Sequence, residues 1–256
     1  MNGVLLLASF LCLVTAEPQR ETFTVGNTQR ETLIVAPAKL PEAGAPLVLV
    51  FHGHGGTARN ASRRLAIHAH WPEAVVVYLQ GQPGVAGITD PEGKQNGWQK
   101  NPGELDDRDV KFVDVVLAEL PKKHRIDAKR IYAMGHSNGS RFVNVLWNMR
   151  GKHFAAFCTA CGPGGTLLRN VSPKPVFVIA GEKDRLVPYD GQLRSVETIR
   201  KLLETDSVKA TVKGHYRVER GKEGVELATY LHPGGHEFPQ EAVPLVAAFF
   251  QKHPQK

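Results

Sequence analysis

The pentapeptide G-H-S-N-G at residues 135–139 constrains the fold of this chain more than any other stretch. An apolar run at residues 130–134 precedes it and predicts a buried strand, whereas residues 141–149 have the apolar spacing of a helix. A sharp strand-to-helix turn with the pattern G-x-S-x-G lifts the serine hydroxyl clear of a sheet, and the glycines leave room for the strained serine backbone. The pentapeptide alone could be a chance match in a glycine-rich chain, but this context favours Ser137 as a catalytic nucleophile.

Residues that could act with this serine follow it in the chain. Residues 175–180 form an apolar run that predicts a strand, and Asp184 lies just past its end, where a carboxylate can orient a histidine. His236 follows two glycines, which let its imidazole reach across the end of the sheet, so we predict it as the general base and acid. Other candidates are Asp190 for the carboxylate and His215 or His232 for the imidazole. The simpler interpretation of Asp190 is a helix cap, and that of the two histidines is a structural role.

A glycine-rich loop, H-G-H-G-G at residues 52–56, follows another apolar run at residues 46–51. Glycines let a backbone pass close to a reacting carbonyl group, so that amide N–H groups can donate to the oxygen that becomes negative. We predict that the backbone N–H groups of His54 and Asn138 form such an oxyanion hole. The simpler interpretation is a glycine turn before the next helix, and we expect His52 to be structural.

The segment from residue 80 to residue 104 is rich in Gly, Pro, Asn and Asp, which predicts a long loop. Loops of this length in a compact domain are usually functional or disordered, and this one leaves the carboxyl end of a predicted strand. We therefore expect it to border the substrate cleft, with Trp98 as a wall of the cleft. A buried Trp98 that anchors the loop is an equal alternative. Tyr189 is a second candidate for substrate contact.

The first part of the chain, residues 1–16, is apolar and ends in the small-residue pattern Val14-Thr15-Ala16, which is typical of a secretory signal peptide. The stretch is shorter than the roughly twenty apolar residues needed to span a bilayer. It contains no Lys or Arg, which is unusual for a signal peptide. We expect residues 1–16 to be removed and residues 17–256 to form a single domain that is secreted or periplasmic.

The formal net charge is +7. Such a charge could attract a polyanion, for example an acidic polysaccharide. The basic residues are scattered along the sequence, however, and no nucleic-acid-binding motif accompanies them. We therefore expect no nucleic-acid partner.

Cys158 and Cys161 lie three positions apart at the end of an apolar run. In a strand, residues three apart point to opposite faces, so we predict two buried thiols. A disulfide and a redox or metal-binding motif are the alternatives. No second pair of ligands completes a zinc site, so we expect no metal.

Apolar strand-like runs alternate with helical segments after residue 46, which predicts an α/β fold. The segments include a helix predicted over residues 57–69, a helix predicted to open at Asp106-Asp107 and a strand predicted over residues 210–218. Residues 22–25 and 30–35, joined by Gly26-Asn27, predict a hairpin at the antiparallel edge of the sheet. We expect a mostly parallel central sheet of about eight strands with helices on both faces.

The order Ser137, Asp184, His236 is that of the α/β-hydrolases, and the chain resembles this superfamily across nearly all of residues 17–256. More narrowly, it resembles the group of polyhydroxybutyrate depolymerases and feruloyl or acetyl xylan esterases. Members of that group commonly have Trp where this chain has Phe238. The stretches that resemble the group are residues 49–56, 130–139, 181–189 and 234–239.

The resemblance implies an exported carboxylic ester hydrolase that forms an acyl-serine intermediate and needs no cofactor. Its substrate would be a small-molecule or polymer-linked ester of the feruloyl, acetyl or hydroxyalkanoate type, and no membrane partner is expected after removal of the signal peptide. Two alternatives stay open. One is a serine peptidase or acyltransferase on the same fold, and the other is a binding protein without turnover on a hydrolase scaffold. The sequence leaves the oligomeric state open.

Overall fold

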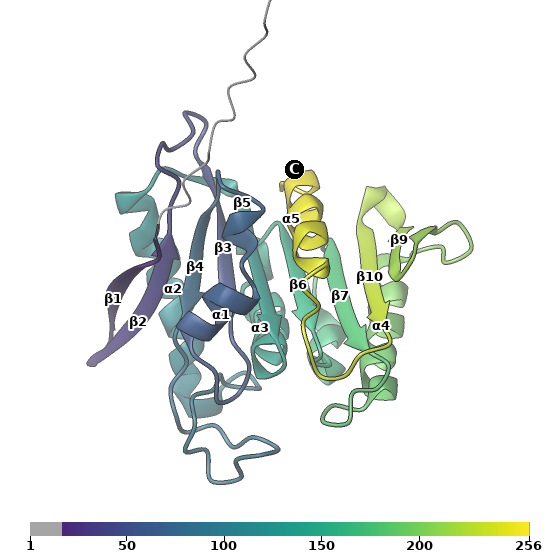
Figure 1. Ribbon diagram of the computed structural model, residues 1–256, viewed down its shortest axis with the longest axis horizontal. Helices are drawn as coiled ribbons and strands as arrows, with labels where there is room; N and C mark the ends of the chain where they lie inside the picture. Colours follow the sequence, from purple (N-terminus) through teal and green to yellow (C-terminus); the bar gives the residue numbers. More distant parts are fainter. Residues whose placement is uncertain (1–16, 256) are drawn as a thin grey trace, which may run out of the picture.

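The computed structural model describes residues 17–255, through which a ten-stranded sheet runs (Figure 1). The predicted signal peptide therefore lies outside the described residues. The strands are β1 (Gln19–Val25), β2 (Thr28–Val35), β3 (Ala45–Phe51), β4 (Val75–Leu79), β5 (Ile126–His136), β6 (Ala156–Ala160), β7 (Val176–Gly181), β8 (Thr211–Lys213), β9 (Tyr216–Arg220) and β10 (Glu226–His232). Their order in the sheet is β1-β2-β4-β3-β5-β6-β7-β10-β9-β8. The strands from β4 to β10 in this order are parallel neighbours, and the outer pairs on both sides are antiparallel.

Helices cover both faces of the sheet, as the sequence predicts. Within the described residues the α-helices are α1 (Ala58–Arg64), α2 (Arg108–Lys123), α3 (Asn138–Arg150), α4 (Tyr189–Leu203) and α5 (Ala242–Lys252). The buried side chains of α1 and α5 pack on one face, in front of the strands in Figure 1, and those of α2, α3 and α4 pack on the other. Among these residues no helix is both long and apolar enough to cross a membrane.

The parallel strands bring several loops to one edge of the sheet. Strands β3, β4, β6 and β7 are buried along their whole length, which is why they are continuous apolar runs. At their carboxyl ends Phe51 of β3 pairs with Gly135 of β5, and Gly181 of β7 pairs with His232 of β10. The loops that follow β3, β5, β7 and β10 therefore meet at the edge where open α/β sheets bind ligands.

The sheet is larger than the predicted eight or so strands. Residues 210–218, predicted as one strand, are divided between β8 and β9, which pair antiparallel around Gly214. Gly214 has φ of +59°, a left-handed conformation that glycine adopts at little cost. The turn escaped prediction because β8 is exposed along its whole length and has no buried face that would reveal where the chain reverses. The predicted hairpin of β1 and β2 at the other edge is confirmed.

Two helices begin or end at residues other than those predicted from the sequence. The helix predicted over residues 57–69 ends at Arg64. The helix predicted to open at Asp106-Asp107 begins at Arg108, because residues 105–107 all have φ near +50°, in the left-handed region. Such a run of residues with side chains is strained, and it lies just after the long loop that leaves β4.

Glu219 on β9 connects the outer strands to α4. Its side chain is 1% exposed, and its carboxylate accepts hydrogen bonds from Arg200, Arg217 and Thr205 at 2.8–2.9 Å. Burial alone would raise the pKa of this carboxyl group, but the hydrogen bonds outweigh it and lower the pKa from 4.5 to about 2. Because the pKa is depressed in the folded state, the stabilisation is present above pH 4.5 and is lost as the pH falls toward 2.

Replacing Glu219 with Gln is expected to lower the free energy of unfolding by about 2–3 kcal/mol at neutral pH. The lowered pKa corresponds to about 3.4 kcal/mol at about 1.4 kcal/mol per pKa unit, and we expect a smaller loss because the side chains of Arg200 and Arg217 are 26% and 34% exposed and their charges are partly screened by water. The difference from wild type should shrink as the pH falls through the acidic range, where the wild-type carboxylate is itself protonated. Urea denaturation at a series of pH values measures it. The exposed Glu73→Gln control should change stability by about 0.5 kcal/mol or less throughout. A loss in Glu219→Gln that does not vary with pH would contradict this account.

Candidate active site

Ser137 lies in a sharp turn between β5 and α3. Its φ of 56° and ψ of −120° are strained for a residue with a side chain. A Cβ atom on Gly139 would collide with the carbonyl oxygen of Phe51, and a Cβ atom on Gly135 would collide with the carbonyl group of Gly139. Both glycines of the pentapeptide are therefore required by backbone contacts, as expected for a nucleophile turn.

The side chains of Ser137, His236 and Asp184 lie in hydrogen-bonding contact. Oγ of Ser137 is 2.7 Å from Nε2 of His236, and Nδ1 of His236 is 2.7 Å from Oδ2 of Asp184. With its hydrogen on Nδ1, the imidazole donates to the carboxylate and accepts from the hydroxyl. This arrangement suits a nucleophile, its base and an orienting acid. The side chain of His236 is 17% exposed, so the predicted base is partly open to solvent.

Asp184 is held by its own loop and by α4. Its Oδ1 accepts from the backbone N–H groups of Leu186 and Val187 at 2.9 and 2.8 Å, and its Oδ2 accepts from Nε2 of Gln192 at 3.0 Å. Burial raises the pKa of this carboxyl group, but the hydrogen bonds from Val187, His236 and Leu186 outweigh burial and lower it. Asp184 is therefore ionised at neutral pH and can stabilise a positively charged imidazole.

The alternative residues do not take these positions. Asp190 is exposed in the first turn of α4. His232 is buried at the end of β10, where its Nδ1 accepts from the backbone N–H of Gly234 at 3.2 Å, and His215 is exposed between β8 and β9. Both histidines line the cleft, but the imidazole that contacts Ser137 is that of His236.

The backbone N–H groups predicted for the oxyanion hole belong to two segments that meet at Ser137. Asn138 is the first residue of α3, where N–H groups have no partner within the helix. His54 lies in the glycine loop, and a Cβ on the neighbouring Gly53 would be 3.4 Å from Cβ of Ser137. Within residues 17–255 neither N–H donates to a backbone acceptor. Both groups are thus free to donate to a ligand.

Trp98 is completely buried, so it anchors the long loop and does not form a wall of the cleft. Its Nε1–H donates to the carbonyl oxygen of His52 at 2.9 Å, and its ring stacks on Phe142. Its backbone N–H donates to Oδ1 of Asn138 at 2.7 Å, and Nδ2 of Asn138 donates to its carbonyl oxygen at 2.9 Å. The loop is therefore fixed to both segments that hold the predicted oxyanion donors.

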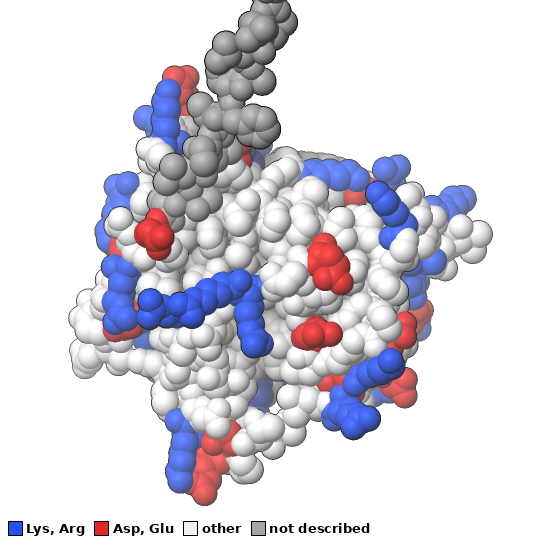
Figure 2. All heavy atoms as spheres, viewed as in Figure 1, with Lys and Arg blue, Asp and Glu red and all other residues white. Residues whose placement is uncertain are grey.

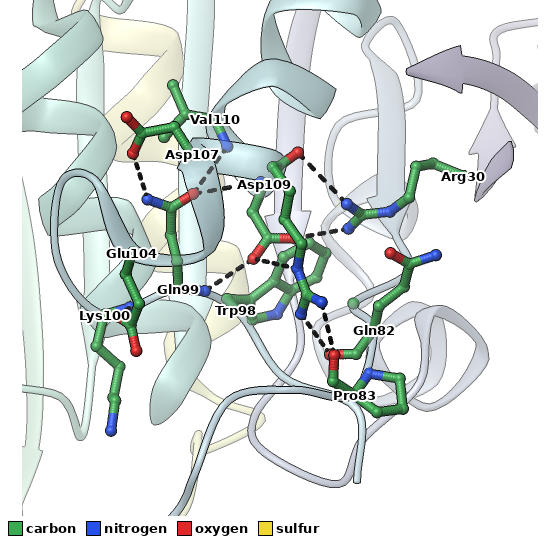
Figure 3. A network of polar contacts seen from close by, with 12 residues as sticks. Arg30, Gln82, Pro83, Trp98, Gln99, Lys100, Glu104, Asp107, Asp109 and Val110 are labelled. Atoms are coloured by element: carbon green, nitrogen blue, oxygen red, sulfur yellow. Dashed lines mark hydrogen bonds and ion pairs between the residues drawn. The ribbon is translucent and has the colours of Figure 1, made fainter. Parts of the chain in front are cut away.

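Gln99 extends this anchor to α2 (Figure 3). Its backbone N–H donates to Oδ2 of Asp109 at 2.8 Å, and its Oε1 accepts from the backbone N–H groups of Asp109 and Val110 at 3.2 Å. Asp109 in turn pairs with Arg30 of β2 at 2.8 Å, and these side chains are 0% and 2% exposed. Sequence reasoning missed the pair, because charged residues near an edge strand and a helix start are usually solvated.

Two further histidines beside the site are neutral. Burial lowers the pKa of His52 to about 4, and its Nε2 accepts from the backbone N–H of Gly81 at 2.9 Å, which confirms a structural role. Burial also lowers the pKa of His136 to about 4, and the ring of His136 lies 5.0 Å from that of His236. A neutral His136 places no positive charge beside the imidazole of His236, the predicted general base.

A cavity of about 1030 Å³ opens over Ser137 and His236. Its walls come from the glycine loop, from α1 and from residues 232–241. Thr89 brings the long loop to the same cavity, which confirms that this loop borders the cleft.

Tyr189 does not line this cavity. It is half-buried at the start of α4, so its predicted contact with substrate finds no support in the position of its side chain. Sequence reasoning missed Arg64 and Glu241, which do line the cavity. No sequence signal marks them, because charged residues at the end of one helix and just before another are ordinarily solvated.

Cys158 and Cys161 are buried free thiols, as predicted. Sγ of Cys161 donates to the carbonyl oxygen of Glu237 at 3.3 Å, and burial raises the pKa of its thiol to about 12. Ligand atoms of Cys161, Asp184 and His236 lie within 4.8 Å of one another. A thiol that stays protonated is a poor metal ligand, and Asp184 already engages Nδ1 of His236. The chemistry of this set therefore fits a hydrogen-bonded triad better than a metal site.

Comparison with known proteins points to esterases. No family model matches the chain. "Putative esterase NocK" of Nocardia uniformis subsp. tsuyamanensis is 34% identical over 184 residues, which are 67% of this chain and 50% of that protein. "Feruloyl esterase B" of Piromyces equi is 27% identical over 167 residues, which are 60% of this chain and 29% of that protein. The chain spans half or less of the length of these relatives.

The fold agrees with a solved structure over most of both chains. The acetyl xylan esterase from Aspergillus awamori matches with a TM-score of 0.68 over 90% of this chain and 99% of that one, at 12% identity. The mostly parallel sheet with helices on both faces and the strand-turn-helix at Ser137 are those of an α/β-hydrolase fold. Within this superfamily the chain resembles the group that includes feruloyl and acetyl xylan esterases.

Proposed function

We propose that the protein is an exported serine carboxylic ester hydrolase that uses Ser137, His236 and Asp184 as a catalytic triad. The observation that supports this most strongly is the pair of 2.7 Å contacts that link the three side chains beneath an open cavity. Relatives named as esterases support the same class of reaction.

In the acylation step, Oγ of Ser137 attacks the carbonyl carbon of the ester while Nε2 of His236 takes the hydroxyl proton. The carbonyl oxygen becomes negative and accepts hydrogen bonds from the backbone N–H groups of His54 and Asn138. The bond to the alcohol then breaks, and His236 gives its proton to the departing alcohol. The acyl group stays on Ser137, and Asp184 stabilises the imidazolium while it exists.

In the deacylation step, water replaces the alcohol and the same groups act again. His236 takes a proton from the water as its oxygen attacks the acyl-serine, and returns that proton to Oγ of Ser137 as the acid leaves. The balance is one ester and one water for one carboxylic acid and one alcohol. Apart from the ester and the water, residues of the chain supply every group in these steps.

The substrate is a feruloyl, acetyl or hydroxyalkanoate ester, either as a small molecule or linked to a polymer. The cavity of about 1030 Å³ is at the upper end of the roughly 300–1000 Å³ usual for small-molecule sites. It is therefore large enough for an aromatic acyl group or a short oligomer.

Hydrolysis of 4-nitrophenyl acetate, methyl ferulate and methyl 3-hydroxybutyrate, each beside the matched amide, tests the proposal. We expect ester hydrolysis that far exceeds amide hydrolysis, together with labelling of Ser137 by a fluorophosphonate probe. Faster cleavage of the amides would indicate a peptidase, and preferred transfer of the acyl group to an added alcohol would indicate an acyltransferase. A protein that is neither labelled nor active would be a binding protein.

A further inference from the structure

The helix α1 carries three arginines, one of which lies in the wall of the cleft. Arg59, Arg63 and Arg64 are exposed on this helix, and Arg64 lines the cavity over Ser137. Figure 2 shows basic side chains that cross the surface over α1. The three arginines lie within residues 59–64, and the position of α1 brings Arg64 to the cavity over Ser137.

The opposite wall of the same cleft is acidic. Glu237 and Glu241 line the cavity from the segment that follows His236, and Glu241 accepts a hydrogen bond from the hydroxyl group of Tyr230 at 3.4 Å. In Figure 2 acidic side chains lie across from α1, toward the start of α5. An anionic group in the cleft is therefore attracted to one wall and repelled by the other, which fixes its orientation.

Arg63 and Arg64 both lie in the last turn of α1, where basic residues complement the helix dipole. Only Arg64 of the two also lines the cavity over Ser137. The backbone of Arg64 has a structural role, since its carbonyl oxygen accepts from Nε2 of Gln240 at 2.8 Å. Its guanidinium group forms no ion pair with a carboxylate of residues 17–255 and is free to bind a ligand.

Arg64 and Ser137 line the same cavity of about 1030 Å³, so a substrate that reacts at Ser137 can extend to the guanidinium group of Arg64. Burial is the main cause of the lowered pKa of His136, the residue before Ser137, and the positive charge of Arg64 also contributes to it.

We infer that the cleft binds esters that carry a carboxylate, and that Arg64 binds this carboxylate. The inference rests on the proposed ester hydrolysis and adds the charge of the substrate. Arginine is suited to the task because its planar guanidinium group can donate two parallel hydrogen bonds to one carboxylate. The carboxylate belongs to the acyl part or to the alcohol part of the ester, and the chemistry at Arg64 is the same for both.

Two pairs of substrates that differ in charge test the inference. The pair 4-acetoxybenzoate and 4-acetoxybenzamide varies the charge of the alcohol part, and the pair of 4-nitrophenyl hydrogen adipate and 4-nitrophenyl hexanoate varies the charge of the acyl part. The measured quantity is the ratio of kcat/KM for the charged ester to that for the neutral ester. In at least one pair Arg64→Gln is expected to lower this ratio about tenfold, and Arg64→Lys should lower it less.

The Arg59→Gln variant is the matched control, because it removes the same charge from the same helix. Arg59 lines a separate cavity with Arg63 and not the cleft over Ser137, so its loss should change the ratio much less than the loss of Arg64. An unchanged ratio in Arg64→Gln for both pairs would overturn the inference, and so would an equal loss in Arg59→Gln. A wild-type protein that hydrolyses none of these esters would instead refute the proposed function. The pair that responds identifies the part of the ester that bears the carboxylate.

Discussion

Replacing Ser137 with alanine is expected to lower kcat for a 4-nitrophenyl ester by about a millionfold. The variant lacks the atom that attacks the carbonyl carbon, and His236 then has no hydroxyl proton to accept. The remaining rate over the uncatalysed reaction would come from the oxyanion donors and from substrate binding alone. Initial rates, together with fluorophosphonate titration to exclude traces of wild-type enzyme, measure the loss.

Ser140→Ala is a matched control within the same pentapeptide-to-helix turn. The Ser140 side chain is buried, and its Oγ donates to the carbonyl oxygen of Gly162 at 3.0 Å. Its loss should cost about 1 kcal/mol of stability and leave most of the activity, because the contacts of His236 are untouched. A Ser137→Ala enzyme as active as Ser140→Ala would remove Ser137 from the mechanism.

The Asp109→Ala substitution is expected to lower the free energy of unfolding by about 3–5 kcal/mol. The change leaves the buried guanidinium group of Arg30 without its carboxylate and removes the acceptor for the backbone N–H of Gln99. An uncompensated charge in the core is costly, because neither water nor a partner solvates it. Urea denaturation at neutral pH measures the effect.

Asp114→Ala provides the comparison from the same helix. Asp114 binds Arg150 through two 2.7 Å contacts, but these side chains are 38% and 29% exposed, so the loss should be about 0–1 kcal/mol. The double substitution of Arg30→Met and Asp109→Leu should recover much of the stability that Asp109→Ala loses, since an apolar pair leaves no buried charge. Equal losses in Asp109→Ala and Asp114→Ala would show that the buried pair does not secure the long loop.

The sequence was most informative where function depends on the end of a strand. Ser137, Asp184 and His236 could each be named because an apolar run or a glycine pair marks where the chain leaves the sheet. Parallel pairing then brings these ends to one edge, and the structure has the three side chains in contact. Their catalytic roles stay predictions until the variants are measured.

The features that escaped prediction depend on contacts between distant parts of the chain. Arg30 and Asp109 are 79 positions apart, and neither has a local pattern that indicates burial. For Trp98 the sequence left a wall of the cleft and a buried anchor as equal alternatives, and only the packing of its indole against Phe142 in the core decides between them. The exposure of Arg64 could be expected, but not the cavity beside it, which forms only when α1 and residues 232–241 face each other.

Asn138 joins two parts of the molecule that enzyme engineering would ordinarily treat as separate modules. Both the oxygen and the nitrogen of its amide side chain are paired with the backbone of Trp98, while its own backbone N–H is a predicted oxyanion donor. Transplanting residues 80–104 from another esterase would thus exchange a neighbour of the nucleophile turn, not only the rim of the entrance. A chimera designed for new selectivity must keep the Trp98 backbone in register with Asn138, or the altered preference will come with slower turnover.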